Sequence, residues 1–247
     1  MISHNHLMPQ ILDHNNLLLA FTRAAKGKRS KNEVREFQNE LQDNLQGLRQ
    51  KLAYGGMRFG DYHFFTVKDP KPRSICAATF EERVAHHALI NIIGPVLDRS
   101  LIFHSYACRQ GKGQHRALDR AKRWAVANNF YLQMDIRKYF DSIDHQILMK
   151  RLQKKFKEQR VLDIIQAILD SFQTAPGKGL PLGNLTSQHL ANFYLSSFDH
   201  WIKEEKGIKH YLRYMDDMLV FGDKEGLLDL RDQCNCFLDK ELKQEIK

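Results

Sequence analysis

Two adjacent acids, Asp216 and Asp217, stand between two short apolar and aromatic runs within residues 212–221. The runs are rich in Tyr, Leu, Val and Phe, which favour strands, whereas an Asp pair favours a turn. We therefore predict a β-hairpin with the acids at its tip. Two carboxylates beside so much apolar surface are costly to desolvate unless a cation meets them, and a divalent metal ion is the candidate. A solvated turn is the alternative, because Asp is mostly a surface residue.

A third acid, Asp135, ends the strand-like run 130–134 and is followed by an aromatic pair, Tyr139 and Phe140. Hard cations such as Mg²⁺ take oxygen ligands from one or two carboxylates together with substrate phosphates. Asp135 and Asp216, placed on neighbouring strands, would share two metal ions. This pattern predicts the palm of a polymerase.

The elements that must position these acids follow from the spacing of the apolar residues. Helical spacing is found at 17–25, 32–52, 80–97, 145–156, 159–172, 191–201 and 224–242, with Pro95 expected to end the third of these helices. Another helix is expected to begin near Gln114. A strand at 62–67 leads through a Lys- and Pro-rich turn into 73–76, which predicts a basic β-hairpin. The sequence therefore predicts an α/β fold of the α+β kind.

The composition limits the class of protein. The chain has 247 residues, 43% of them hydrophobic, which permits a real core. Its net charge of +9 and pI near 9.3 suit a polyanionic partner. The apolar stretch 88–97 is too short to span a bilayer, and no signal peptide is seen, so we expect a cytoplasmic protein without a membrane partner. The four cysteines lack zinc-ribbon spacing and are expected to be reduced thiols.

Three segments in a fixed order resemble the motifs of reverse transcriptases. They are Asp135 with an aromatic residue five positions later, Gly-Leu-Pro-Leu-Gly-Asn-Leu-Thr-Ser-Gln at 179–188, and Tyr-Met-Asp-Asp at 214–217. The resemblance implies the right-hand polymerase fold, with fingers at 1–127 that carry the basic β-hairpin at about 62–76. It implies a palm at 128–247, whose antiparallel sheet is backed by helices and which has a helical insertion at about 145–175. Related enzymes continue into a helical thumb, so we expect the thumb to be absent or truncated here.

The same resemblance implies the metal site. Asp135, Asp216 and Asp217 would be the catalytic carboxylates of an RNA-directed DNA polymerase and would hold two Mg²⁺ ions, with Mn²⁺ as a possible substitute. The backbone carbonyl of Ile136 would join the coordination. Lys247 is the candidate for the palm lysine that protonates pyrophosphate in this family.

The residues that would bind nucleotide and nucleic acid are also carried over from the family. Phe140 would lie against the incoming sugar and exclude a ribose hydroxyl. Lys68 and Arg73 would grip the triphosphate, with Lys71 as the alternative to Lys68. A fourth stretch, Ser-Tyr-Ala-Cys-Arg followed by Gly-Lys-Gly at 105–113, places Arg109 and Lys112 along the template path.

The loop at 180–188 indicates the subtype. Most reverse transcriptases have Gln where this chain has Leu182 and commonly Pro where it has Gln188. Both departures resemble the reverse transcriptases of diversity-generating retroelements, which copy a template RNA with frequent errors opposite adenine. Gly183 would let the backbone lie close to a base or sugar, and Gln188 would contact nucleic acid. The alternative is that Leu182 only packs in an otherwise accurate site.

Other functions stay open at this point. A retron, group II intron or phage-defence reverse transcriptase shares the metal site, and a catalytically silent RNA-binding subunit would use the palm as scaffold only. An RNA-synthesising polymerase is disfavoured by Phe140. The expected partners are template RNA, a primer or cDNA strand, deoxynucleoside triphosphates and an accessory basic protein of the retroelement.

Overall fold

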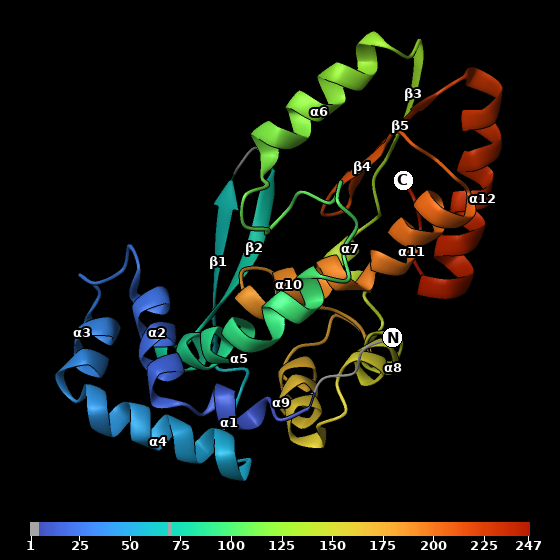
Figure 1. Cartoon of the computed structure of the whole chain (residues 1–247). Helices are drawn as coiled ribbons and strands as arrows, with labels where there is room; N and C mark the ends of the chain where they lie inside the picture. Colours follow the sequence, from blue (N-terminus) through green and yellow to red (C-terminus); the bar gives the residue numbers. More distant parts are fainter. Residues whose placement is uncertain (1–4, 69–70) are drawn as a thin grey trace. The chain divides into compact units, whose positions relative to one another are not determined.

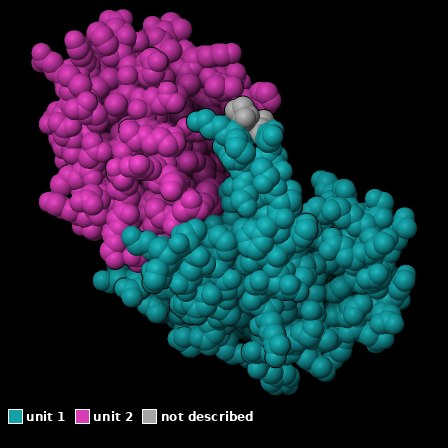
Figure 2. Space-filling view, turned by 180° about the vertical axis from the view of Figure 1, so that it is seen from behind, with its two compact units in different colours: residues 1–96, 145–188 teal, residues 97–144, 189–247 magenta. Residues whose placement is uncertain are grey.

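The computed structural model describes residues 5–68 and 71–247 of the chain. It divides into two compact units, coloured separately in Figure 2. Unit 1 comprises residues 1–96 and 145–188, and unit 2 comprises residues 97–144 and 189–247. The predicted boundary between fingers and palm at 127/128 is a functional division and stays a prediction.

Unit 1 is mostly helical and carries one β-hairpin (Figure 1). Its elements are α1 (Met8–Ile11), α2 (His14–Ala25), α3 (Asn32–Asn39), α4 (Leu41–Tyr54), β1 (Tyr62–Lys68), β2 (Pro72–Ala78), most of α5 (Phe80–Asp98), α8 (His145–Lys155) and α9 (Gln159–Asp170). Apolar residues of α2, α4 and α5 form its core, in which Leu48, Val84 and Ala88 have no exposed surface. The predicted hairpin at about 62–76 lies at β1 and β2, which pair antiparallel.

Three predicted helices differ from the structure in their bounds. The helix expected over 32–52 is two helices, because the backbone of Glu40 leaves the helical conformation with ψ of 44°. Pro95 does not end α5, which continues to Asp98. The long helix expected through residue 201 is interrupted at Leu195, where the Ser196 hydroxyl donates to the Phe193 carbonyl at 2.7 Å. Such local side-chain bonds compete with regular helical bonding.

Unit 2 is built on a three-stranded antiparallel sheet of order β3-β5-β4. Its elements are α6 (Gln114–Val126), β3 (Phe130–Met134), α7 (Tyr139–Ser142), most of α10 (Leu185–Tyr194), α11 (Ser196–His200), the π-helical turn η1 (Trp201–Glu205), β4 (Tyr211–Tyr214), β5 (Asp217–Gly222) and α12 (Lys224–Leu242).

The two faces of this sheet are covered by different helices. Leu219 and Phe221 of β5 pack with Ala117 and Trp124 of α6. Met218 and Val220 point to the other face and are fully buried. Figure 1 shows α6 and α12 on opposite sides of the strands. The predicted antiparallel sheet backed by helices is therefore confirmed.

Two short segments extend the sheet at its edges. Residues 245–247 pair with the chain just after β3 through an antiparallel bridge between Ile136 and Ile246. At the other edge, a parallel bridge joins Ser105 to Arg213 of β4.

All four cysteines lie among the described residues, and none of them is joined in a disulfide bond. Within the described part of the chain, no helix has both the length and the apolar character needed to cross a membrane.

Candidate active site

The predicted acidic hairpin tip is present in unit 2. β4 and β5 are joined by a two-residue loop, Met215 and Asp216, and the strands close with Tyr214 opposite Asp217. Met215 has a φ of +56°, in the left-handed region that side chains with a Cβ rarely adopt. A conformation of this kind persists only where surrounding contacts enforce it.

The register of the sheet brings the third acid to the same place. The last pair between β3 and β5 is Met134 with Met218. Continuing this register by one step would place Asp135 opposite Asp217, on the same face of the sheet. Like charges directly opposite each other are destabilising, so these carboxylates require a cation nearby. Burial raises the pKa of Asp216, and the charges of Asp135 and Asp217 raise it further.

The cation that meets these acids in the structure is the ammonium of Lys247. Its Nζ donates to the Asp135 carboxylate, and its backbone N–H donates to the Asp135 carbonyl at 2.9 Å. The hydrogen bond to Asp135 raises the pKa of Lys247, and the charges of all three acids act in the same direction. The carboxylates thus create a field that favours a cation.

A divalent metal ion fits this donor set, since Mg²⁺ takes carboxylate oxygens. As arranged here, no three His, Cys, Asp or Glu side chains among residues 5–68 and 71–247 gather closely enough to hold a metal. The metal-binding roles of Asp135, Asp216 and Asp217 therefore stay predictions.

Ile136 is buried, with 1% of its surface exposed. The hydrogen bonds of the bridge to Ile246 are made by its neighbours, from the Arg137 N–H to the Glu245 carbonyl at 2.8 Å and from Lys247 to Asp135. In an antiparallel ladder this pattern turns the carbonyl of Ile136 away from Ile246. The orientation suits the predicted coordination, which stays a prediction.

The aromatic pair after Asp135 lies on α7. Tyr139 is a core residue, as predicted, and its hydroxyl donates to the Ala191 carbonyl at 2.5 Å. Phe140 is half-buried and packs edge-on against Tyr139, with ring centroids 5.7 Å apart. The ring of Phe140 is therefore partly exposed. Phe140 belongs to unit 2, as do the three acids, and its exclusion of a ribose hydroxyl stays a prediction.

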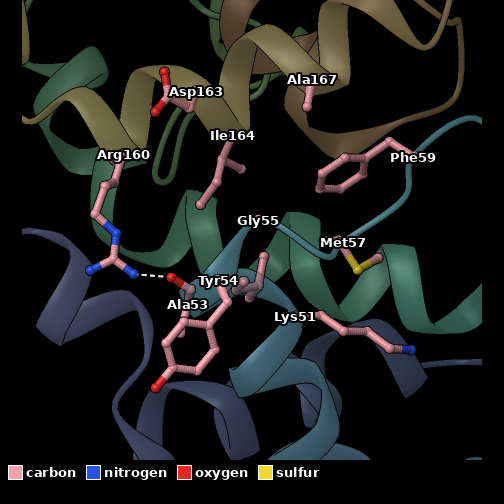
Figure 3. Close-up of a pocket in the computed structure, with 11 residues that line it drawn as sticks. Lys51, Ala53, Tyr54, Gly55, Met57, Phe59, Arg160, Asp163, Ile164 and Ala167 are labelled. Atoms are coloured by element: carbon pink, nitrogen blue, oxygen red, sulfur yellow. Dashed lines mark hydrogen bonds between the residues drawn. The ribbon is translucent and has the colours of Figure 1, made fainter.

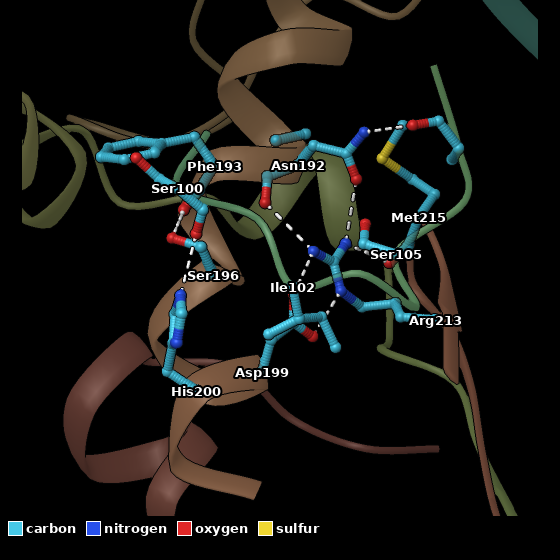
Figure 4. A network of polar contacts seen from close by, with 12 residues as sticks. Ser100, Ile102, Ser105, Asn192, Phe193, Ser196, Asp199, His200, Arg213 and Met215 are labelled. Atoms are coloured by element: carbon cyan, nitrogen blue, oxygen red, sulfur yellow. Dashed lines mark hydrogen bonds and ion pairs between the residues drawn. The ribbon is translucent and has the colours of Figure 1, made fainter. Parts of the chain in front are cut away.

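A buried ion pair lies next to the hairpin tip and is bonded to its backbone (Figure 4). Arg213 and Asp199 both have side chains with 0% exposure, and the guanidinium makes two bonds to the carboxylate, at 2.8 and 2.6 Å. Nη1 donates to the Asn192 side-chain oxygen at 3.0 Å and to the Met215 carbonyl at 2.9 Å, and Nη2 also donates to the Asn192 carbonyl at 3.2 Å. The Tyr211 hydroxyl donates to Asp199 at 2.7 Å. Arg213 thus binds the strained loop residue directly.

Sequence analysis did not identify this network. The available signal was a charged residue inside the apolar run 211–214, which implies a buried partner. The partners themselves were not predictable, because they lie on α10 and α11.

The predicted triphosphate-binding residues lie at the far end of the unit 1 hairpin. Lys68 is opposite Pro72, and Arg73 is opposite Val67. Since opposed residues share a face and successive residues alternate, the Lys68 and Arg73 side chains leave the hairpin on opposite faces. Lys71, the alternative to Lys68, is exposed in the turn. Their roles stay predictions.

The loop with Leu182 and Gly183 is attached to β2 within unit 1. The Cys76 N–H donates to the Leu182 carbonyl at 2.7 Å. Gly183 has a φ of +118°, and a Cβ there would lie 2.7 Å from Cγ2 of Ile75 and 3.0 Å from the Cys76 carbonyl oxygen. Packing against β2 therefore requires Gly183, and its predicted approach to a base or sugar stays a prediction. The Leu182 side chain is half-buried, as is Gln188 on α10.

Arg109 and Lys112 are held by local contacts in unit 2. Arg109 bonds Asp98 at 2.6 Å and the carbonyls of Ile102 and Ser105 at 2.7 and 2.9 Å. Lys112 donates to the Phe103 carbonyl at 2.8 Å. The Arg109 contacts stabilise the loop itself, and its contact with a template stays a prediction.

A hollow of about 380 Å³ lies in unit 1, between the end of α4 and α9 (Figure 3). Met57, Phe59 and Ile164 give it an apolar floor, and Arg160 donates to the Ala53 carbonyl at its edge. None of the predicted site residues lines it, so it is separate from the candidate active site.

Solved structures share this architecture. A chain of the Cas6-RT-Cas1–Cas2 complex matches 96% of this chain and 27% of its own length, with a TM-score of 0.56 and 17% identity. The likeness shows the fingers-and-palm fold of right-hand polymerases, here with paired acids on a hairpin tip of the sheet.

The sequence comparisons give the family. The model of the reverse transcriptase (RNA-dependent DNA polymerase) family matches residues 67–242, and the chain belongs to this family. It is 22% identical over 169 residues to the putative COX1/OXI3 intron 1 protein of Saccharomyces cerevisiae, covering 65% of this chain. It is 25% identical over 142 residues to the group II intron-encoded protein LtrA of Lactococcus lactis subsp. cremoris, covering 55% of this chain. The chain spans 20% and 24% of the lengths of these two relatives.

Proposed function

We propose that the protein is an RNA-directed DNA polymerase that extends a primer strand on a template RNA. The observation that carries this proposal is the sheet register, which would place Asp135 opposite Asp217 beside the hairpin tip that bears Asp216, together with the ammonium of Lys247 bound to Asp135. Burial raises the pKa of Asp216, and the charges of Asp135 and Asp217 raise it further, an arrangement that a structural scaffold does not need. Membership of the reverse transcriptase family supports the same chemistry.

The three carboxylates and the carbonyl of Ile136 would hold two Mg²⁺ ions, for which Mn²⁺ could substitute. When bound, these ions would lower the pKa of the primer 3′-hydroxyl and neutralise charge on the leaving pyrophosphate. Lys247 holds a proton at Nζ beside Asp135 and is the candidate donor to the pyrophosphate. Lys68 or Lys71, together with Arg73, would bind the triphosphate of the incoming nucleotide, and Phe140 would exclude a 2′-hydroxyl from its sugar.

Primer extension on an RNA template tests this proposal. Asp135→Asn and Asp216→Asn should each lower the extension rate on the order of 10³-fold or more, because the amide is a poorer metal ligand. Asp239→Asn, at an exposed position of α12, is the matched control and should extend normally. Substantial extension by the Asp216→Asn protein in Mg²⁺ would contradict the metal assignment, whereas no extension by the unmodified chain would favour the silent RNA-binding subunit.

Within the family, we propose the retroelement subtype, which makes errors opposite template adenine and works with an accessory basic protein. Leu182 and Gln188 support it. The alternative, a group II intron-like enzyme, is favoured by the similarity to LtrA and to the yeast intron protein.

Sequencing the products of a Leu182→Gln variant distinguishes the retroelement subtype from the group II intron-like alternative. If the apolar side chain weakens base selection, one recovered hydrogen bond of about 1 kcal/mol should reduce errors opposite adenine several-fold. Equal error rates in the two proteins would show that Leu182 is a packing residue.

A further inference from the structure

A cluster of cations lies on α6 in unit 2, outside the predicted metal site. Arg116, Arg120 and Arg123 are spaced four and three residues apart, so they share one side of the helix. Together with the loop before α6 they line a cavity of about 340 Å³. Its full lining is Phe103, Tyr106, Lys112, Arg116, Asp119, Arg120 and Arg123. The lining therefore contains one acid, Asp119, and four cations.

Local contacts hold Lys112 and Arg116 in place without neutralising them. The Lys112 ammonium lies 3.3 Å from the centre of the Phe103 ring, and Arg116 donates to the Gly111 carbonyl. Burial lowers the pKa of Lys112, and the charges of Arg109, Arg116 and Arg120 lower it further. Like charges held this closely repel one another, and an anionic ligand would relieve that repulsion.

The cluster is separate from the acids of the hairpin tip. The other side of α6, with Ala117, Leu118 and Ala121, faces β4 and β5 and lines a narrow hollow that reaches Tyr214 and Asp217. At 100° per residue the two sides are roughly opposite around the helix, and a helix is about 10 Å wide. A nucleic-acid strand bound at these cations would therefore contact the protein at a site separate from the three acids.

We propose that this cluster binds the phosphates of a single-stranded nucleic acid while a base stacks on Phe103. Arginine forks match phosphate oxygens, and three of them project from one helix face. Phe103 is 67% exposed, so its ring is accessible to a base. A cationic groove with an exposed aromatic ring is the typical arrangement for single strands. The proposal rests on the proposed function only in taking template RNA as that strand.

The test is binding of a short fluorescein-labelled single-stranded RNA to the 247-residue chain, by fluorescence anisotropy across a NaCl titration. Each phosphate contact on a single strand adds about 0.7 to the slope of log Kd against log salt. Replacing Arg116, Arg120 and Arg123 together by Gln should therefore lower the slope by about 2. Replacing all three by Lys should keep most of it, because point charges also bind phosphate.

A matched triple variant controls for net charge. Lys224, Arg231 and Lys240 are exposed on α12 of the same unit, and their replacement by Gln removes the same charge. The slope of this control should stay unchanged. Equal losses in the two Gln triples, or no loss in the α6 triple, would overturn the proposal. Thermal melting of each variant shows that it is folded.

Phe103→Ala tests the stacking separately. It should weaken binding of the single strand roughly tenfold without changing the salt slope. It should affect an RNA duplex much less, because the bases inside a duplex are already stacked on their neighbours. Equal binding of the single strand by Phe103→Ala and the unmodified chain would remove the stacking part of the proposal. All these titrations omit divalent metal and nucleotides, so their outcome is independent of whether the chain extends a primer.

Discussion

Arg213 is a fully buried charge within a strand, and its contacts explain why it is there. Its guanidinium joins the Asp199 carboxylate to the carbonyl of Met215, the residue with a left-handed backbone beside Asp216. Taking a charge pair out of water is expensive, and a similar apolar pair often stabilises a fold better. The pair is therefore better explained by the loop geometry that it enforces.

We predict that Arg213→Lys lowers the primer-extension rate about 10²-fold, because lysine cannot bond Asp199, Asn192 and Met215 at once. A displacement of about 1 Å in a reacting group can cost this much. The half-saturating Mg²⁺ concentration should rise as well, which a loss of stability alone would not cause. Arg231→Lys, at an exposed position of α12, is the control. An unchanged Mg²⁺ dependence in the Arg213→Lys protein would assign the pair to stability only.

The acids themselves were predictable at the residue scale, whereas their support was not. An Asp pair between two strand-forming runs has few structures open to it, and the hairpin tip formed as predicted. Arg213 contacts residues 14 and 21 positions away, on helices whose placement depends on the whole unit. For Gly183, the packing against Ile75 and Cys76 is a reason for glycine that the sequence did not reveal, and its predicted approach to a ligand stays a prediction.

At the scale of elements, periodicity located nearly every helix but not the places where a helix breaks. The helix at 224–242 matches its prediction because its apolar face is regular. The helix predicted at 17–25 begins three residues earlier, at His14, and the helix expected near Gln114 begins there. The breaks at Glu40 and Leu195 depend on single backbone angles and hydrogen bonds that periodicity does not report.

The contact between α5 and the start of α10 in unit 1 makes the stability of the folded protein depend on pH. His86 is buried, and its Nδ1 lies 2.8 Å from the Thr186 hydroxyl. Burial lowers the pKa of His86 to about 3, with a smaller contribution from His87. The folded protein keeps this imidazole neutral, whereas the unfolded chain takes up a proton below about pH 6.5. Stability is therefore lost as the pH falls from about 6.5 towards 3.

We predict that His86→Phe flattens this loss, since the ring still packs on Phe59 but takes no proton. The difference in unfolding free energy between the two proteins should change by up to about 1.4 kcal/mol per pH unit below pH 6.5. Urea unfolding at a series of pH values measures it. His115→Gln, exposed on α6, should behave like the unmodified chain, and parallel pH curves for the His86 variant and the unmodified chain would contradict the assignment.

At the scale of the whole molecule, metal binding should be visible as stability. A ligand that binds only the folded state at about 100 times its Kd adds about 2.7 kcal/mol. For a chain of this size that corresponds to a rise in Tm of roughly 5–10 °C. We predict that Mg²⁺ or Mn²⁺ raises Tm, that EDTA reverses the rise, and that Asp135→Asn abolishes it.

In the same melting experiment, Lys247→Ala should have the opposite effect to Asp135→Asn and favour metal binding. Its ammonium and a metal ion compete for the Asp135 carboxylate, so removing it should lower the Mg²⁺ concentration at which Tm rises. A higher Mg²⁺ requirement in Lys247→Ala would show that the lysine assists the metal instead.

The Arg213 network also has a consequence for slow motions of the backbone. The Arg213 N–H donates to the His104 carbonyl at 3.0 Å, and the Tyr106 N–H donates back to the Arg213 carbonyl at 2.9 Å. The loop that supplies Phe103 and Lys112 is thereby bonded to the same residue that holds the acidic tip. Segments connected in this way open as one cooperative unit. The amide hydrogens of Tyr106 and Arg213 should therefore exchange with deuterium at a common rate, and Asp199→Asn should accelerate both together.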